Sequence, residues 1–388
     1  MTMPFPSANQ SAGIYVHIPF CRHKCIYCDF FSITDHDLMA PFLNALKLDT
    51  GLALPEKGPA FDTIYIGGGT PSVLNGEQIS EILETVFSSA NICTNNEITI
   101  EVNPESCRSD WLRTVRLAGV NRISLGVQSF NDSALGFLGR VHDARQAIES
   151  YKAARIAGFS NIGLDIIYGL PDQTRSDLEQ DLNQALALEP DHISCYLLTV
   201  ESGTPLAESL RKKRYRPLAE SKLSDMFLAV SEILTRHGYL HYEISNFART
   251  PETCSRHNVK YWRRLPYIGL GPSAHSCILP GQRHWNVKNV TEYVDRLSAG
   301  RSPRLSGETL SIRQQMMESV LLGLRLGEGI KIEAFNRSFG VDFQALFTPV
   351  LSHYQAAGML SLSGGRCRLS LRGMLFHETI AADLAALI

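Results

Sequence analysis

The sequence lacks the features of a membrane or secreted protein. No stretch of about 18 apolar residues, the length that a membrane-spanning helix needs, occurs in the 388 residues. The first residues, MTMPFPSANQSAG, contain no basic residue and no apolar segment such as a leader peptide carries. These absences predict a soluble, cytoplasmic protein.

A strong net charge is also missing. The 37 lysines and arginines nearly balance the 39 aspartates and glutamates, which leaves a formal net charge of −2. Because no overall basic field is present, nucleic acid is not expected as a partner. The one basic run, RKKRYR at 211–216, is interpreted as a solvated loop.

A disulfide framework is the third missing feature. Nine cysteines are an odd number, and six of them follow no mutual spacing. Secreted frameworks contain paired, regularly spaced cysteines, so we expect these six to be reduced thiols. They are Cys93, Cys107, Cys195, Cys254, Cys277 and Cys367.

What the sequence does contain is an alternation of short β-rich runs with segments of helical period. The β-rich runs span 14–20, 63–69, 97–104, 122–129, 162–171 and 192–199. Parallel strands need crossover connections, so this order predicts a parallel sheet with helices outside it. Several runs alternate apolar with small or polar residues. This pattern favours an open, six-unit relative of the (β/α)8 barrel over a flat doubly wound sheet.

The alternation stops after about residue 205, which predicts three parts. Residues 1–240 form the barrel core, 241–305 an irregular connecting segment, and 306–388 a smaller domain. In the last part, two helical patterns precede LSLSGGRCRLSL, a hairpin pattern that turns at Gly364 and Gly365. Two helices followed by a hairpin resemble a winged helix, and we expect a winged-helix-like α+β domain.

Three further cysteines stand close together. Cys21, Cys25 and Cys28 form C-x3-C-x2-C directly after the first predicted strand. Structural zinc takes four closed ligands, whereas three thiolates on a four-iron cluster leave one iron open. Zinc with a distant fourth ligand and a chance group of thiols are the alternatives.

This spacing, on a loop after the first strand of a βα repeat, resembles the radical S-adenosylmethionine (SAM) superfamily. In that superfamily a [4Fe-4S] cluster binds SAM at its open iron, and the reduced cluster cleaves SAM to a radical. The resemblance implies both cofactors here, with Cys21, Cys25 and Cys28 as cluster ligands. It also implies a partial (β/α)6 barrel of radical SAM type and an electron donor for the cluster.

The other predicted strand ends suit such a ligand. GGGTP at 67–71 follows the second strand, where missing Cβ atoms let the backbone approach a bound amino acid. Glu101 and Asp165 place carboxylates on the third and fifth strands, where they suit ribose hydroxyls or an ammonium group. Gln128 ends the fourth strand, and Arg140 follows with a guanidinium that suits a carboxylate. Each of these could instead be a satisfied structural polar group.

The motifs YVHIPFC, GGGTP, GVQSFN, LGR and DIIYGLP resemble the oxygen-independent coproporphyrinogen III oxidase group of this superfamily, across nearly the whole chain. Position by position, the resemblance implies a set of SAM contacts. They are Tyr15, Tyr27, Gly68, Gly69, Thr70, Glu101, Gln128, Arg140 and Asp165.

That group has two branches. The oxidases carry a further cysteine two residues after the third one, and a longer N-terminal arm. Here Phe30 takes that position, and only 20 residues precede Cys21. Both departures match the second branch, which is associated with heme binding and delivery.

The second branch also shows the motif H-N-x-x-Y-W, present here as HNVKYW at 257–262. Histidine can ligate heme iron, and Tyr and Trp can stack on a porphyrin. The resemblance implies His257 as a heme ligand. His241 and His275 are the next candidates because they lie in the same His-rich and aromatic stretch. Alternatively, the motif residues only seal the barrel mouth.

Two functions therefore stand as expectations. The first is a heme chaperone that keeps the cluster and SAM site and passes heme to an acceptor protein. The second is the enzyme that converts two propionates of coproporphyrinogen III to vinyl groups by radical decarboxylation. No catalytic residue is assigned from the sequence.

Overall fold

The computed structural model describes residues 11–54 and 58–388. Positions 1–10, to which most of the leader prediction refers, lie outside the described residues. Within the described ranges, every helix is too short or too polar to cross a membrane.

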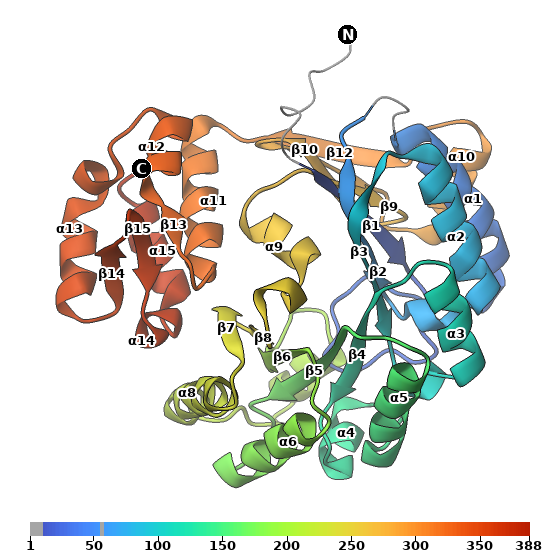
Figure 1. Ribbon diagram of the computed structural model, residues 1–388, viewed down its shortest axis with the longest axis horizontal. Coiled ribbons are helices and arrows are strands. Elements are labelled where there is room, and N and C mark those ends of the chain that lie inside the picture. The colour runs from blue at the N-terminus through green and yellow to red at the C-terminus, as the bar shows by residue number, and fades with distance from the viewer. Residues whose placement is uncertain (1–10, 55–57) are drawn as a thin grey trace.

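The larger unit is built on one open sheet (Figure 1). Its strands are β1 (Ala12–Ile18), β2 (Phe61–Gly68), β3 (Ile92–Val102), β4 (Arg122–Gln128), β5 (Ile162–Tyr168), β6 (His192–Leu197), β7 (Leu240–Glu243), β8 (Asn246–Ala248), β9 (Tyr267–Leu270), β10 (His275–Leu279), β11 (Gln282–Asn286) and β12 (Arg304–Thr309). Their order is β12-β11-β10-β9-β1-β2-β3-β4-β5-β6-β8-β7. Neighbours from β1 to β6 are all parallel, which confirms the predicted six-unit repeat.

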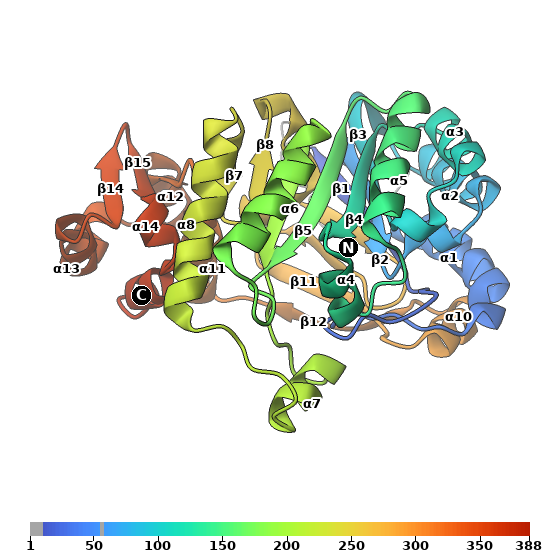
Figure 2. The same ribbon diagram turned by 90° about the horizontal axis from the view of Figure 1, so that it is seen from below.

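Helices that follow the six parallel strands cover the outer face of the sheet (Figures 1 and 2). They are α1 (Met39–Ala53), α2 (Gly76–Ser89), α3 (Ser109–Leu117), α5 (Ala144–Ile156), α6 (Arg175–Ala187) and α8 (Glu220–Arg236). In α2, the Asn75 side chain accepts from the Gln78 N–H and so satisfies a free amide at the helix start. The helical period then places Ile79, Leu83 and Val86 on the buried face.

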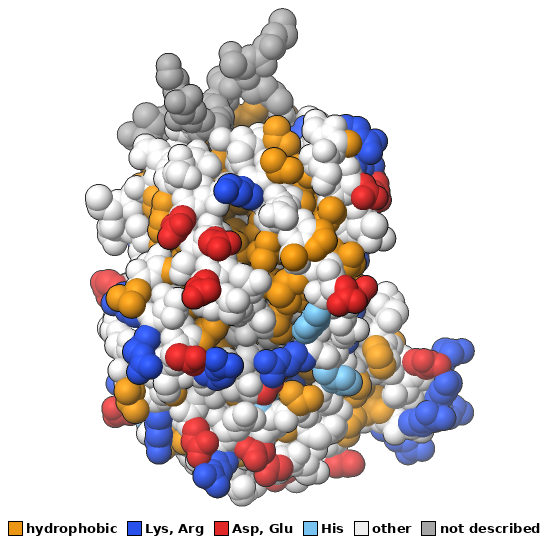
Figure 3. Space-filling model, turned by 90° about the vertical axis from the view of Figure 1, so that its right-hand side faces the viewer, with side chains coloured by type: hydrophobic (Ala, Val, Ile, Leu, Met, Phe, Trp, Pro, Cys, Tyr) orange, Lys and Arg blue, Asp and Glu red, His pale blue; other side chains and the backbone are white. Residues whose placement is uncertain are grey.

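Shorter helices complete this unit. They are α4 (Asp132–Leu138), α7 (Pro205–Arg211), α9 (Arg256–Trp262), α10 (Val290–Ser298), and the 3-10 turns η1 (His36–Leu38), η2 (Pro71–Val73), η3 (Pro104–Ser106) and η4 (Pro251–Thr253). Helix α7 projects from the molecule in Figure 2, and basic side chains gather on the matching projection in Figure 3. In the run 211–216, all residues except Tyr215 are exposed, so the run is solvated as predicted.

Residues 241–305 carry more regular structure than their Gly, Pro and His content suggests. Strand β9 pairs in parallel with β1, and β8 pairs antiparallel with β6, so this stretch extends both edges of the six-strand repeat. The boundaries at 240/241 and 305/306 remain a prediction.

The C-terminal unit has its own hydrophobic core. Its elements are α11 (Ile312–Arg325), β13 (Ile330–Lys331), α12 (Ile332–Phe339), α13 (Phe343–Ala356), β14 (Leu360–Ser363), β15 (Arg366–Leu369), α14 (Leu371–Met374) and α15 (His377–Ala385). The hairpin β14–β15 turns at Gly364 and Gly365, with φ of 56° and 70°, a region that glycine enters without a Cβ clash. The predicted α+β character and hairpin are confirmed.

Candidate functional site

The predicted cysteines lie on the loop after β1. The loop folds back on itself because the Cys21 N–H donates to the Ile33 carbonyl (2.9 Å) and the Ile33 N–H donates to the Pro19 carbonyl (2.7 Å). Cys21 is buried, and Cys25 and Cys28 are half-buried. All three side chains line one cavity of about 880 Å³.

Two of the three sulfurs receive hydrogen bonds from other elements. The Thr70 hydroxyl donates to Cys21 Sγ at 3.4 Å, and Arg140 Nη1 donates to Cys25 Sγ at 3.5 Å. Burial raises the pKa of Cys21, and the Thr70 hydrogen bond opposes that rise. Within residues 11–54 and 58–388, no three His, Cys, Asp or Glu side chains converge closely enough for a single metal ion. The donor set fits a thiolate-bound iron–sulfur cluster better than a closed zinc centre.

The glycine-rich turn at 67–71 joins the end of β2 to the cysteine loop. The Gly69 N–H donates to the Ile18 carbonyl (2.8 Å), and the Thr70 N–H donates to the Phe20 carbonyl (2.7 Å). A Cβ on Gly69 would lie 2.7 Å from the Phe20 carbonyl oxygen. Glycine is therefore required at position 69 by the approach of the cysteine loop itself, whatever ligand is bound.

Glu101 lies near the end of β3 and faces the cavity. Its carboxylate accepts from the Tyr65 hydroxyl at 2.8 Å and from the Gly68 N–H at 3.2 Å. Burial, opposed by the Tyr65 hydrogen bond and assisted by the charge of Asp165, raises the pKa of Glu101 to about 7. The side chain can therefore hold or release a proton near neutral pH.

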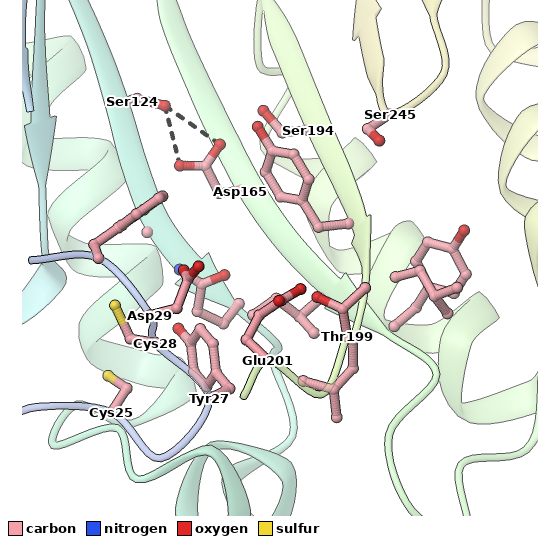
Figure 4. Close-up of a pocket in the computed structure, with 18 of the residues that line it drawn as sticks. Cys25, Tyr27, Cys28, Asp29, Ser124, Asp165, Ser194, Thr199, Glu201 and Ser245 are labelled. Carbon is pink, nitrogen blue, oxygen red and sulfur yellow. Dashed lines mark hydrogen bonds between the residues drawn. The ribbon is translucent and has the colours of Figure 1, made fainter. Parts of the chain in front are cut away.

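Asp165 lies across the same cavity, on β5. The Ser124 hydroxyl lies 3.0 Å and 3.3 Å from its two carboxylate oxygens. Figure 4 shows this pair on one side of the cavity, with Cys25, Cys28 and Tyr27 on the other. Burial raises the pKa of Asp165. The cavity thus joins the thiols to a hydrogen-bonded acidic group.

Arg140 and Gln128 lie where β4 ends. Arg140 Nη2 donates to Asn103 Oδ1 (2.7 Å) and to the Gly126 carbonyl (3.0 Å), which fixes the guanidinium. Gln128 has a φ of 69°, which is uncommon for a residue with a Cβ. Strained backbone of this kind is concentrated at functional sites.

The structure brings eight of the nine expected SAM contacts to this cavity. They are Tyr27, Gly68, Gly69, Thr70, Glu101, Gln128, Arg140 and Asp165. Tyr15 lies behind the lining, where its hydroxyl donates to Nδ1 of His17 (3.1 Å) and its ring stacks on Tyr65 with centroids 6.2 Å apart. Tyr15 is a neighbour of the lining residues and does not line the cavity itself.

The HNVKYW motif forms α9, and His257 is only 1% exposed. Thr63 Oγ1 lies 2.8 Å from its Nδ1, and Tyr261 Oη lies 2.9 Å from its Nε2, so both ring nitrogens are engaged. Burial, with a smaller effect of the Lys260 charge, lowers the pKa of His257 to about 3. A heme iron could bind this ring only if one of the two hydrogen bonds were released.

The end of α9 contacts the C-terminal unit. The Arg325 guanidinium lies 4.3 Å from the ring centroid of Trp262, and Arg325 Nε donates to Glu243 Oε2 at 2.7 Å. Asn258, in the same motif, lines the cavity. The motif therefore joins the two units beside the cavity.

The two further histidine candidates do not line the cavity. His241 hydrogen-bonds to Ser231 Oγ at 3.0 Å and to the Ile244 carbonyl at 3.1 Å. His275 is exposed, and its ring stacks on Trp285 with centroids 5.6 Å apart.

Sequence reasoning missed two groups of lining residues. One comes from the C-terminal unit, namely Arg325 and residues 374–379. No local pattern could place these against the barrel. The other is the pair Arg122 and His192, which begin β4 and β6. The one sequence feature that could have indicated Arg122 and His192 is a polar residue at the start of a buried strand.

Comparisons with family models match two parts of the chain. The Radical SAM superfamily model matches residues 15–185, and the HemN C-terminal domain model matches residues 310–376.

Curated relatives match most or nearly all of the chain. A protein named heme chaperone HemW from Bacillus subtilis is 35% identical, over 96% of this chain and 99% of its own. HemW of Mycobacterium tuberculosis is 34% identical over 98% and 96%. HemW of Escherichia coli is 39% identical over 68% and 69%.

A solved structure supports the same grouping. Coproporphyrinogen III oxidase (HemN) from Escherichia coli, described as a radical SAM enzyme, has a TM-score of 0.83 at 23% identity, covering 98% of this chain and 91% of that one. At this identity the match shows the shared fold, and it confirms the predicted radical SAM-type barrel with a C-terminal α+β domain. Together with the relatives above, it shows that the chain belongs to the HemW branch of the HemN-like group within the radical SAM superfamily.

Proposed function

We propose that this protein is a heme chaperone that binds heme, a [4Fe-4S] cluster and SAM, and transfers heme to an acceptor protein. The observation that carries the proposal is the near-full-length similarity to proteins named heme chaperones. The site agrees with it, because Phe30 lines the cavity where the oxidases place a further cysteine. The cytoplasm as location and an external electron donor belong to the same proposal.

Cys21, Cys25 and Cys28 would hold the cluster. When bound and reduced, the cluster would supply an electron to SAM. The chain's own residues would orient that ligand. Glu101 presents a buried carboxylate with a pKa near 7, and Asp165 presents a second carboxylate that Ser124 holds in place. Both suit the ammonium or ribose hydroxyl groups of SAM.

The cavity wall also suits a flat apolar ligand. Phe30, Tyr196, Leu197 and Phe376 line it, although each is between 36% and 60% exposed. Exposed apolar side chains in one concave site mark a ligand surface, and aromatic rings stack on porphyrins. We propose that this wall contacts heme. His257 stays the predicted iron ligand, provided that its ring releases the hydrogen bond to Thr63 or to Tyr261.

A hemin titration of the anaerobically reconstituted protein tests the proposal. We expect saturable binding of one hemin per chain, measured from the absorbance of the Soret band. Replacing Phe30 and Phe376 by Ser should weaken binding, whereas Leu117→Ser, at an exposed apolar residue outside the cavity, should not. Linear, non-saturating uptake that is equal in all three proteins would contradict a specific heme site.

A further inference from the structure

The deep part of the cavity contains an arginine with two unpartnered nitrogen atoms. Arg122 begins β4, is 2% exposed and lines the cavity. Its Nε and Nη1 atoms are buried and have no hydrogen-bond partner among the described residues. Asp165 lies close enough for its pKa to be affected by Arg122, but it accepts its hydrogen bonds from serines. Buried guanidinium nitrogens without hydrogen bonds are costly, so these two atoms require an acceptor.

Two further polar atoms next to Arg122 are also unpartnered. Thr99 pairs with Arg122 in the register of β3 and β4, and its hydroxyl has no partner among the described residues. In His192 the free atom is Nδ1. Tyr242 Oη accepts from the Ser255 N–H (3.2 Å) and lies 2.8 Å from Nε2 of His192. In the tautomer in which the Tyr242 hydroxyl donates to Nε2, the ring proton is on Nδ1 and can be donated to a ligand. Burial holds the pKa of His192 well below its ordinary value, which keeps the ring neutral.

A glycine lies beside Arg122 and His192, where a side chain would crowd them. Gly163 on β5 pairs with Ser124 of β4 and with His192 of β6. A Cβ at this position would lie 3.2 Å from His192 Nδ1 and 3.6 Å from Arg122 Nη2. A side chain at position 163 would therefore contact both the imidazole and the guanidinium and crowd the donors that face the cavity. These donors suit an anion, and the planar guanidinium matches the two oxygens of a carboxylate.

We propose that Arg122, His192 and Thr99 form a carboxylate subsite that receives a propionate side chain of heme, an assignment that rests on the proposed function. Arg122 lies at the start of β4 and Gln128 at its end, about 20 Å of strand apart. The carboxylate subsite is therefore distant from the strand end where Gln128 and Arg140 lie. The two propionates are the only anionic side chains of heme, so the subsite would fix the orientation of the ring.

The first test compares hemin with hemin dimethyl ester, which has no free carboxylate. We expect the wild-type protein to bind hemin about tenfold or more tightly than the ester, because charge-assisted hydrogen bonds are lost. Arg122→Met should reduce this ratio to about threefold or less. Arg108→Met, which removes the same charge from an exposed site, should leave the ratio unchanged. A ratio that is the same in wild type and Arg122→Met overturns the assignment.

Gly163→Ala provides a second variant in case Arg122→Met does not fold. It retains the arginine but crowds the donors, so it should also reduce the hemin-to-ester ratio. Gly136→Ala, whose added Cβ would meet no atom within 4 Å, is the matched control. If Gly163→Ala retains the wild-type ratio, no propionate binds beside Gly163.

A third test does not depend on heme. Sodium propanoate should raise the thermal midpoint of the wild-type protein, since a ligand of the folded state stabilises it, and should not raise that of Arg122→Met or Gly163→Ala. If hemin fails to bind while this pattern holds, the proposed function fails and a carboxylate subsite stands. Equal shifts in all three proteins, or none in wild type, overturn the subsite.

Discussion

The hydroxyl of Thr70 donates a hydrogen bond to the sulfur of Cys21 at 3.4 Å, across 49 residues of sequence. This contact joins the glycine-rich turn after β2 to the cysteine loop after β1. In the same region, Arg140 donates to Cys25 Sγ at 3.5 Å. Two segments outside the loop therefore contact its thiols, and the cysteine loop is fixed against the barrel.

Replacing Cys21, Cys25 or Cys28 by Ala should abolish the brown chromophore formed on anaerobic reconstitution, because each removes one thiolate of the only three that line the cavity within the described residues. Iron and sulfide per chain, together with the visible spectrum, measure this. Cys93→Ala and Cys254→Ala, at thiols outside the cavity, are the controls. An equal loss in a control would show that the three-thiol assignment is wrong.

Asp165→Asn should weaken SAM binding while the cluster content stays the same. The change removes a charge that accepts hydrogen bonds, which typically costs about 1.5–3 kcal/mol, or roughly 10- to 150-fold in affinity. Calorimetric titration with SAM checks it. Arg140 is a poorer probe because it also contacts Cys25. Unchanged affinity would exclude Asp165 from the site.

The stability of the SAM-free protein should depend on pH through Glu101. Its pKa is about 7 in the folded chain and ordinarily 4.5, so between these values the unfolded state releases the proton and the folded state keeps it. Stability from this group is thus present below pH 4.5 and is lost as pH rises toward 7. Between pH 5 and pH 8, the free energy of unfolding of Glu101→Gln should therefore rise by up to about 3 kcal/mol relative to that of the wild type. Denaturant unfolding of both proteins at each pH measures this. A difference in the free energy of unfolding that stays the same at every pH would contradict the prediction.

His257→Ala should weaken heme binding or shift the Soret band, whereas Cys21→Ala should keep heme. The His257 ring must release one of its two hydrogen bonds to bind iron, and Thr63→Val removes one of them, so this variant should bind heme at least as tightly as wild type. If His257 is only a packing residue, His257→Ala will lower the thermal midpoint and leave the heme spectrum unchanged.

Periodicity predicted the six parallel strands because alternation of strand and helix is a local signal. The observed β4, Arg122–Gln128, differs from the expected run by one residue. The strand ends could be found because parallel strands bring their carboxyl ends together, and Glu101, Gln128 and Asp165 do line one cavity.

Contacts between distant segments could not be predicted in this way. The burial of His257 depends on Thr63, 194 positions away, and the contact of Arg325 with Trp262 depends on how the C-terminal unit packs. Neither leaves a periodic pattern in the sequence. The crowding that a side chain at Gly163 would cause likewise depends on the side chains of the two neighbouring strands.

The most direct test of the central claim uses one preparation of the reconstituted wild-type protein with SAM and a reductant. One portion receives hemin and the other coproporphyrinogen III, and hemin binding and substrate consumption are measured. The account predicts one hemin bound per chain and no consumption of coproporphyrinogen III, even in Phe30→Cys. Conversion of coproporphyrinogen III to its divinyl product by the wild-type protein would contradict it.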